Sequence, residues 1–407
     1  MDRLFDVLTA LVLLKGLAGV WYSLRYHRYI RAQLSHSSHH WMPLSSVIIP
    51  CKGTDYELEK NVRAILNQDF EDYEVIFVTA SERDIALPVL RQAVSAFPHR
   101  RVKFVVAGFS DKRGEKVNNL IQGIRQSDAC SQVLVFADSD GRPHRYWLRD
   151  LLSPLRDPSV GASTGYRWFF PFRGNFASVL RSSWNGAISS LLGDHDHNFA
   201  WGGSMAIKRS TVEAVDLLAY WQGSISDDYS LTAAVRNAGL KIYYQPRCLV
   251  SSHGQCTWRE LLEWSTRQII ITKVYAKRFW TLALLSELPF VLFWWWAVGQ
   301  LVWLAWQVGR LGQSQSQEGL VVVFLVGTIF SLGVIRGSFR WAMIKLIHPE
   351  ERLLINRDWW GYLLLGPLVA TLTVYTLVIS SFTSTVVWRN VRYDLISAQE
   401  VHVVRDC

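Results

Sequence analysis

The chain has 407 residues, of which 50% are hydrophobic, and a formal net charge of +9 at pH 7. This length suggests about two or three domains with a large core. The basic residues flank long apolar segments, so the positive charge gives no reason to expect a nucleic-acid partner. The five cysteines show no CxxC or other metal-ligand spacing, and a reduced, cytoplasmic setting fits them.

Four apolar segments predict a polytopic membrane protein. The first, 4–20, contains only Asp6 and Lys15 as charged residues. Because Trp21 and Tyr22 follow it where a signal peptide would have small residues, we expect a retained transmembrane helix within 1–24. Each segment approaches the ~20 residues that a spanning helix needs, although one of the later three is short. Those three are 288–308, 320–334 and 362–381.

Basic residues at both borders of the central region set the expected orientation. They are Arg25, Arg28, Arg31, Lys273, Lys277 and Arg278. Positive charge favours the cytoplasmic side of a membrane. We therefore expect an integral membrane protein in which a linker, 25–42, leads to a domain that faces the cytoplasm.

Residues 43–262 alternate β-rich apolar runs with helical stretches. This alternation predicts an α/β domain with a largely parallel sheet. The expected strands are 46–50, 73–78, 102–107 and the run from 133, and the expected helices are 60–68 and 116–124. Ligands of such sheets bind at the carboxyl ends of the strands.

One of these strands ends in two carboxylates. The apolar run 133–137 is followed by Asp138, Ser139 and Asp140. Carboxylate oxygens at a strand end suit Mg²⁺ or Mn²⁺. Asp, Ser and Gly also form turns, so a polar turn without metal is the competing interpretation from these residues alone.

The C-terminal part is expected to return to the membrane. Residues 263–281 form an amphipathic pattern that predicts a helix lying on the membrane surface, with a plain connecting helix as the alternative. Membrane helices follow in 282–385, with a polar loop at 313–317, and a basic tail ends the chain at 386–407. Three full spans would place this tail outside the cell, so we favour a break at Gly366 and Pro367 that returns it to the cytoplasm.

Four short motifs resemble the family 2 type of glycosyltransferases, and most closely the ceramide glucosyltransferases. They are Val47–Gly53, Lys116–Leu120, Asp138–Asp140 and Ser226–Leu231. The resemblance spans about 43–278, together with one membrane helix before the domain and several after it. It implies a GT-A fold, a UDP-sugar donor, usually UDP-glucose, inversion at the anomeric carbon, and a lipid acceptor of glycolipid or sphingolipid metabolism.

The resemblance also assigns roles to residues. Lys116 and Asn118 would help to hold the nucleotide, and a glycine segment containing Gly203 would lie near the acceptor. Asp138 would contact the nucleotide and, with Asp140, the metal, Mn²⁺ or Mg²⁺. Asp228 would be the general base that takes the proton from the acceptor hydroxyl.

Two departures from the family pattern are visible. Where the family has an aspartate after the second strand, this chain has Ala80, and Glu82 is the expected substitute. The (Gln/Arg)xxArgTrp motif keeps only Arg267, which is followed by Gln268, and we expect Arg267 to bind the diphosphate.

Two other functions remain as alternatives. A processive polysaccharide synthase would usually need more membrane helices and an intact GlnxxArgTrp motif. A non-catalytic membrane scaffold is consistent with the replaced acid at Ala80, whereas the set of Asp138, Asp140 and Asp228 argues against it. The sequence names neither the sugar, the lipid nor the oligomeric state.

Overall fold

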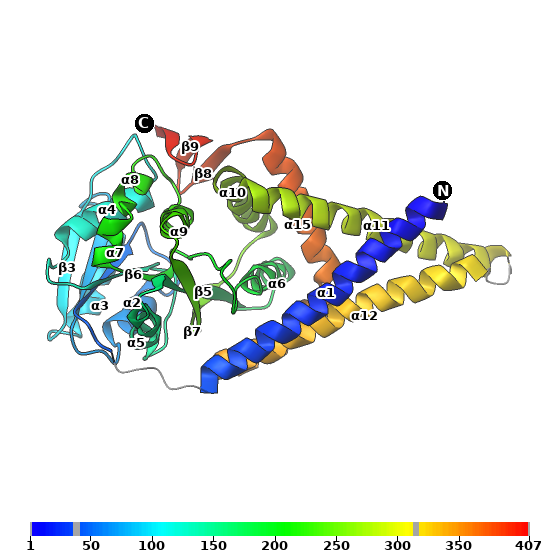
Figure 1. Ribbon diagram of the computed structural model, residues 1–407, viewed down its shortest axis with the longest axis horizontal. Helices are drawn as coiled ribbons and strands as arrows, with labels where there is room; N and C mark the ends of the chain where they lie inside the picture. Colours follow the sequence, from blue (N-terminus) through cyan, green and yellow to red (C-terminus); the bar gives the residue numbers. More distant parts are fainter. Residues whose placement is uncertain (1, 36–40, 312–316, 406–407) are drawn as a thin grey trace.

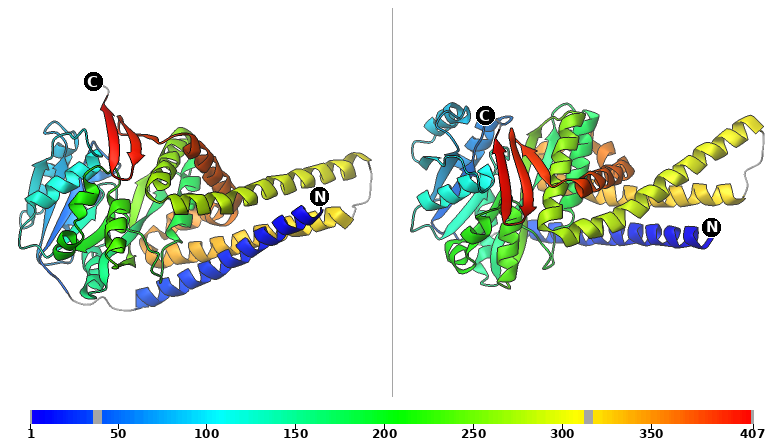
Figure 2. Two further views of the ribbon diagram at one scale, coloured as in Figure 1. Left: turned by 45° about the horizontal axis from the view of Figure 1, so that its top comes forward. Right: turned by 90° about the horizontal axis from the view of Figure 1, so that it is seen from above.

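The computed structural model describes residues 2–35, 41–311 and 317–405. An α/β domain lies at one end of the molecule, and three long helices project from it in one direction (Figure 1). Two further views show the same separation, with the C-terminal strands against the domain (Figure 2). The predicted combination of an α/β domain and membrane helices is confirmed.

The centre of the domain is a seven-stranded sheet with the order β3-β2-β1-β4-β6-β5-β7. Only β6 runs antiparallel to its neighbours, so the predicted largely parallel sheet is confirmed. The strands are β1 (Ser45–Pro50), β2 (Tyr73–Thr79), β3 (Arg101–Val106), β4 (Val133–Ala137), β5 (Val160–Pro171), β6 (Ser204–Lys208) and β7 (Lys241–Gly254).

Helices cover both faces of this sheet, which explains why its central strands are apolar without alternation. Val47 and Ile49 of β1 pack on one face against α2, α3 and α5, while Ile48 packs on the other against α4, α8 and α9. The domain helices are α2 (Leu58–Leu66), α3 (Ala86–Ser95), α4 (Glu115–Gln126), α5 (Trp147–Leu152), α6 (Phe176–Ser189), α7 (Arg209–Ala214), α8 (Leu217–Trp221) and α9 (Asp227–Asn237), with a 3₁₀ turn at Ser153–Arg156.

Three of the described helices are long and apolar enough to cross a membrane. They are α1 (Asp2–Ser35), α11 (Lys277–Leu311) and α12 (Gln317–Ile347). All three are longer than the apolar segments from which they were predicted, and the polar loop expected at 313–317 falls outside the described residues except for Gln317. The three helices pack against one another.

The domain is fixed to these helices by buried contacts. Tyr26 and Ile30 of α1 are buried beside Trp168 and Tyr244 of the sheet, and the hydroxyls of Tyr26 and Tyr244 lie 3.0 Å apart. Because these residues pack on the domain, α1 continues to Ser35, and the predicted linker at 25–42 was too long. The linker can only begin after Ser35, and 36–40 lie outside the described residues.

The last hydrophobic segment is divided as expected near Gly366. It forms α14 (Trp359–Leu364) and the shorter apolar helix α15 (Gly366–Phe382), preceded by a 3₁₀ turn at Pro349–Glu351 and α13 (Arg352–Arg357). With α11 and α12 leading away from the domain and back, the C-terminal residues lie on the domain's side (Figure 1). We predicted this return of the tail.

The tail itself is folded, which the sequence did not predict. It forms an antiparallel sheet of β8 (Thr385–Trp388), β9 (Val391–Ser397) and β10 (Glu400–Arg405). This sheet packs on α10 (Trp258–Tyr275), whose Ile271, Val274 and Tyr275 it covers. The apolar side of α10 is therefore covered by protein, which corrects the prediction of a helix at 263–281 lying free on the membrane surface.

Candidate active site

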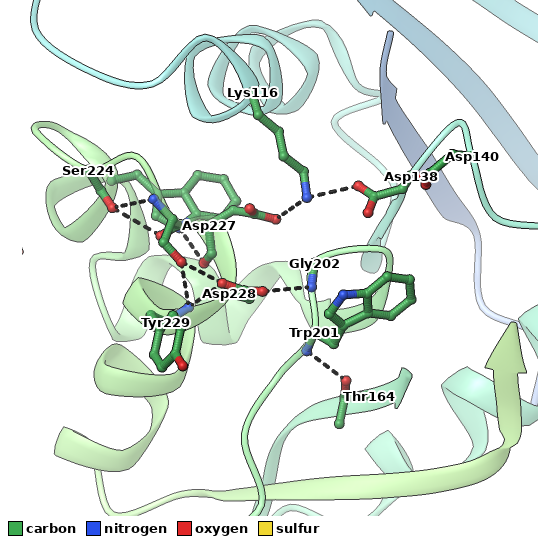
Figure 3. A network of polar contacts seen from close by, with 12 residues as sticks. Lys116, Asp138, Asp140, Thr164, Trp201, Gly202, Ser224, Asp227, Asp228 and Tyr229 are labelled. Atoms are coloured by element: carbon green, nitrogen blue, oxygen red, sulfur yellow. Dashed lines mark hydrogen bonds and ion pairs between the residues drawn. The ribbon is translucent and has the colours of Figure 1, made fainter. Parts of the chain in front are cut away.

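Carboxylates from two distant parts of the chain meet at the carboxyl end of β4. Asp138 follows β4, and Asp227 and Asp228 begin α9 (Figure 3). Lys116 of α4 joins the two groups, because its ammonium lies 2.8 Å from Asp138 and 3.0 Å from Asp227. The structure thus brings together Lys116, Asp138 and Asp228, as the sequence predicted.

Arg167 of β5 is a central member of this site that the sequence analysis missed. Its Nη2 lies 3.0 Å from Asp138 and 2.9 Å from Asp140, and its Nη1 donates to Asp140 at 3.0 Å. Burial would raise the pKa of Asp138, but Lys116 and Arg167 outweigh it and hold that pKa below its ordinary value. A single arginine in an otherwise uncharged and buried strand signals a carboxylate partner, and the arginine was visible in the sequence.

The two carboxylates fit a divalent cation in their chemistry. One cationic nitrogen of Arg167 bridges Asp138 and Asp140, which marks a position where their oxygens converge on positive charge. Among the described residues no group of three or more His, Cys, Asp or Glu side chains is placed to hold a metal. Mg²⁺ or Mn²⁺ would therefore use these carboxylates together with phosphate and water oxygens, as Mg²⁺ usually does.

Asp228 faces the cavity from the first turn of α9. Its Oδ1 accepts hydrogen bonds from the Ser226 hydroxyl and, at 2.8 Å, from the Tyr229 amide. Its Oδ2 accepts the Gly202 amide at 3.3 Å. Ser226 caps the helix by accepting a hydrogen bond from the amide of Tyr229. The Ser226 cap therefore holds the carboxylate of Asp228 in place, while the Oδ2 of Asp228 accepts only one long hydrogen bond.

Asp227 lies behind Asp228 and is 4% exposed. Burial raises its pKa to about 7, with Lys116 acting against this rise and Asp228 and Asp138 adding to it. Above this pH the protein holds a second buried charge beside Asp138, balanced by the ammonium of Lys116.

This pKa predicts how stability depends on pH. Between about pH 4 and pH 7 the folded carboxyl of Asp227 keeps a proton that the unfolded chain has lost, so the free energy of unfolding falls as pH rises. The low pKa of Asp138 acts only below this window. We expect Asp227→Asn to lose less thermal stability than the parent between pH 5 and pH 8, by at most about 3 kcal/mol. Thermal unfolding in detergent measures this, with Glu213→Gln on the exposed face of α7 as control; equal slopes for all three proteins would contradict it.

Two glycines allow the backbone to approach these carboxylates. A Cβ on Gly202 would lie 2.1 Å from Asp227 Oδ2, and one on Gly203 would lie 2.7 Å from Asp138 Oδ2. Gly203 also accepts the Asp138 amide at 3.4 Å. The predicted residue Gly203 is therefore at the site, and its neighbour Gly202 has the closer contact with the catalytic candidates.

Arg267 of α10 lines the same cavity. Its guanidinium lies over the ring of Trp388 of β8, 5.4 Å from the ring centroid. Burial, with Arg389 and Arg167 nearby, lowers its pKa to about 10. Trp388 thus packs on the arginine whose neighbouring tryptophan is missing from the family motif. Arg167, Arg267 and Arg389, which all line this cavity, form a site that suits a diphosphate.

We expect Trp388→Ala to weaken donor binding. The cation–π contact with Arg267 is worth about 0.5–2 kcal/mol, so the KM for the nucleotide sugar should rise roughly 2–30-fold. Val387→Ala is the matched control, because Val387 is the preceding residue of β8 and is exposed. Steady-state kinetics with varied donor measure the effect. An equal rise in KM for both variants would show that any change in the C-terminal sheet weakens donor binding, and that the contact between Trp388 and Arg267 has no specific part in it.

Two predicted residues do not reach the cavity. Glu82 is exposed, and Asn118 donates its amide to the carbonyl oxygens of Ala107 and Gly108 at 3.4 and 3.1 Å. In the segment after β2 it is Asp84 that contacts the first strand's loop, since its Oδ1 accepts the amide of Gly53 at 2.9 Å. Their roles in nucleotide binding therefore remain predictions, and Asp84 is the better-placed acid.

The site opens into a cavity of about 1350 Å³ that continues between the membrane helices. Asp138, Asp228 and Arg267 line its polar end, and Val12 and Phe290 line its apolar end. Drug-sized ligands usually occupy roughly 300–1,000 Å³, so this cavity has room for a larger ligand. Its two ends offer contacts for a charged group and for an alkyl chain.

Comparison with known proteins gives matches over most of the chain. The family described as Glycosyl transferase family 21 matches residues 8–401. Ceramide glucosyltransferase 1 of Caenorhabditis elegans is 31% identical over 104 residues, which are 25% of this chain and 22% of that protein. Glycosyltransferase AglE of Haloferax volcanii is 23% identical over 257 residues, covering 59% of this chain and 81% of that protein.

Solved structures also match this chain at low sequence identity. The mannosyltransferase PcManGT from Pyrobaculum calidifontis, in complex with GDP-Man and Mn²⁺, has a TM-score of 0.48 and 15% identity. The match covers 92% of this chain and 98% of that one.

Proposed function

The chain belongs to glycosyl transferase family 21, and from this premise we propose that it transfers glucose from UDP-glucose to a hydroxyl of a membrane lipid, with inversion at the anomeric carbon. It is a glycosyltransferase with an α/β domain of the GT-A type and helices suited to a membrane. Ceramide is the first acceptor to assay, because the name of the C. elegans relative includes it.

The observation that carries this proposal is a single cavity that joins Asp228 to the membrane helices. A hydroxyl at the polar end would lie beside Asp228, while an alkyl chain would lie along the apolar end. A lipid acceptor accounts for both ends of this cavity. The basic residues beside the membrane segments support a domain that faces the cytoplasm.

In the proposed reaction Asp228 takes the proton of the acceptor hydroxyl. The hydroxyl oxygen forms a bond to the anomeric carbon as the bond from that carbon to the UDP oxygen breaks, and UDP leaves with the electron pair. The weakly bonded Oδ2 of Asp228 is available for this proton. Attack from the side opposite UDP gives inversion.

On the donor side, basic residues hold the diphosphate. Arg267 and Arg167 line the cavity beside Asp138, and Lys116 holds Asp138 and Asp227 in place. Asp138 and Asp140 would hold Mn²⁺ or Mg²⁺, which when bound neutralises charge that develops on the leaving diphosphate. Arg389 of the C-terminal sheet lies 2.6 Å from Asp55 and brings further positive charge to this end.

Purified full-length protein with radiolabelled UDP-glucose, Mn²⁺ and lipid vesicles containing ceramide or other hydroxylated lipids tests the proposal. We expect label in a lipid product, and none with Asp228→Asn. A labelled polymer would instead indicate a polysaccharide synthase. Absence of any labelled product with all common UDP-sugars would contradict the proposed function and favour a non-catalytic scaffold.

A further inference from the structure

Two arginines in the membrane part of the cavity have no ion-pair partner among the described residues. Arg336 and Arg340 of α12 line the cavity, and Arg340 is only 9% exposed. Neither makes a hydrogen bond or an ion pair with another residue in the described part of the chain, and the Nε of Arg336 is buried without a partner. Arginines that line a cavity with little exposure and without an ion-pair partner need an anion to balance their charge.

The surrounding residues do not supply that anion. The carboxylate of Glu287 on α11 also lines this part of the cavity, but Lys15 of α1 already pairs with it at 2.8 Å. The two arginines are four residues apart and so lie on one face of α12, where like charges repel. With Lys15 and Glu287 cancelling each other, Arg336 and Arg340 leave two positive charges facing the cavity.

Both arginines lie in the part of α12 that is nearer the domain. Arg340 and Arg336 are 7 and 11 residues before the end of α12 at Ile347, which is about 10 and 16 Å along the helix from the domain's side. Further along the cavity the wall becomes apolar, with Trp294 of α11 and Ile329 of α12. An anion bound by the arginines would thus lie between alkyl chains on one side and the catalytic carboxylates on the other.

We infer that the acceptor is an anionic phospholipid whose phosphate is bound by Arg336 and Arg340 and whose headgroup hydroxyl reaches Asp228. This inference rests on the proposed function, of which it specifies the acceptor class. Guanidinium groups bind phosphate oxygens in pairs, which suits two arginines on one helix face. A neutral acceptor such as ceramide would leave both charges uncompensated.

Full-length protein in nanodiscs of phosphatidylcholine tests this inference, with phosphatidylglycerol or ceramide as the added acceptor. In phosphatidylglycerol the phosphate joins the part that carries the acyl chains to a glycerol headgroup that has two hydroxyls. We expect label from UDP-glucose to enter phosphatidylglycerol with about tenfold or greater preference over ceramide. The double variant Arg336→Gln, Arg340→Gln should raise the KM for phosphatidylglycerol about tenfold or more while the KM for UDP-glucose stays unchanged. Arg340→Lys should retain only part of the affinity, because it keeps the charge but loses the paired hydrogen bonds of the guanidinium.

Arg310→Gln is the matched control, because Arg310 is exposed at the far end of α11. Retention of phosphatidylglycerol, measured by native mass spectrometry, is a second readout. If no lipid is glycosylated but retention depends on both arginines, the proposed reaction fails and the anionic lipid site stands. If ceramide is glycosylated equally by the parent and the double variant, the inference is overturned. The inference is also overturned if excess inorganic phosphate binds Arg336 and Arg340 while the protein still retains phosphatidylglycerol, because the phosphate of the lipid would then be bound elsewhere.

Discussion

Asp228→Asn is expected to lower kcat by about 10²–10⁴-fold while UDP-glucose still binds. A positioned general base contributes about this much, equivalent to roughly 3–5 kcal/mol of the activation barrier. Asparagine has nearly the same shape and can still accept the Tyr229 amide, but it cannot take the proton of the acceptor hydroxyl. Steady-state transfer to lipid measures kcat, and calorimetric titration with UDP-glucose measures binding.

Asp216→Asn provides the control for this loss of one carboxylate. Asp216 is exposed before α8 with a φ of 48°, a conformation that asparagine tolerates, and it does not line the cavity. This variant should keep full activity. If Asp228→Asn retained more than about a tenth of the parent's kcat, Asp228 would not be the base. Asp227, which is buried and paired with Lys116, would then be the next residue to test.

The parts of the site that the sequence predicted lie within short motifs. Asp138 and Asp140 follow an apolar strand, and Asp228 follows a helix-capping serine, so each has a local pattern that predicts its local structure and suggests its proposed role. The sheet was equally predictable, because strands buried on both faces read as continuous apolar runs. Local patterns of this kind depend on only a few neighbouring residues.

The parts that were missed depend on contacts between distant segments. Arg167 reaches Asp138 across 29 positions of the chain, and Trp388 reaches Arg267 across more than a hundred. Helix α1 continues beyond Ser23 because Tyr26 contacts Tyr244, which lies more than two hundred positions later in the chain. Nothing in the spacing of residues along the chain encodes such pairs, so the length of α1 and the position of the C-terminal sheet required the structure.

Asp140→Asn is expected to reduce Mn²⁺ affinity in the presence of UDP at least about tenfold and kcat about 10²–10³-fold. The reason is electrostatic: the variant keeps one carboxylate, Asp138, at a site where Arg167 already supplies positive charge, so a second cation is poorly compensated. Electron paramagnetic resonance of free Mn²⁺ measures binding without requiring turnover. Glu213→Gln removes an exposed carboxylate elsewhere and should leave the titration unchanged.

Arg167→Gln gives the opposite result for the metal and thereby tests the same arrangement from the other side. Arg167 bridges Asp138 and Asp140 with a nitrogen 3.0 and 2.9 Å from their oxygens, so a cation must compete with it for both carboxylates. Removing the guanidinium should tighten binding of Mn²⁺ alone, by a few-fold or more. It should also weaken UDP-glucose binding, because one positive group beside the diphosphate is lost. Unchanged Mn²⁺ affinity in both Asp140→Asn and Arg167→Gln would show that the pair of carboxylates binds arginine only, and that the diphosphate is neutralised by Arg167, Arg267 and Lys116 without a metal.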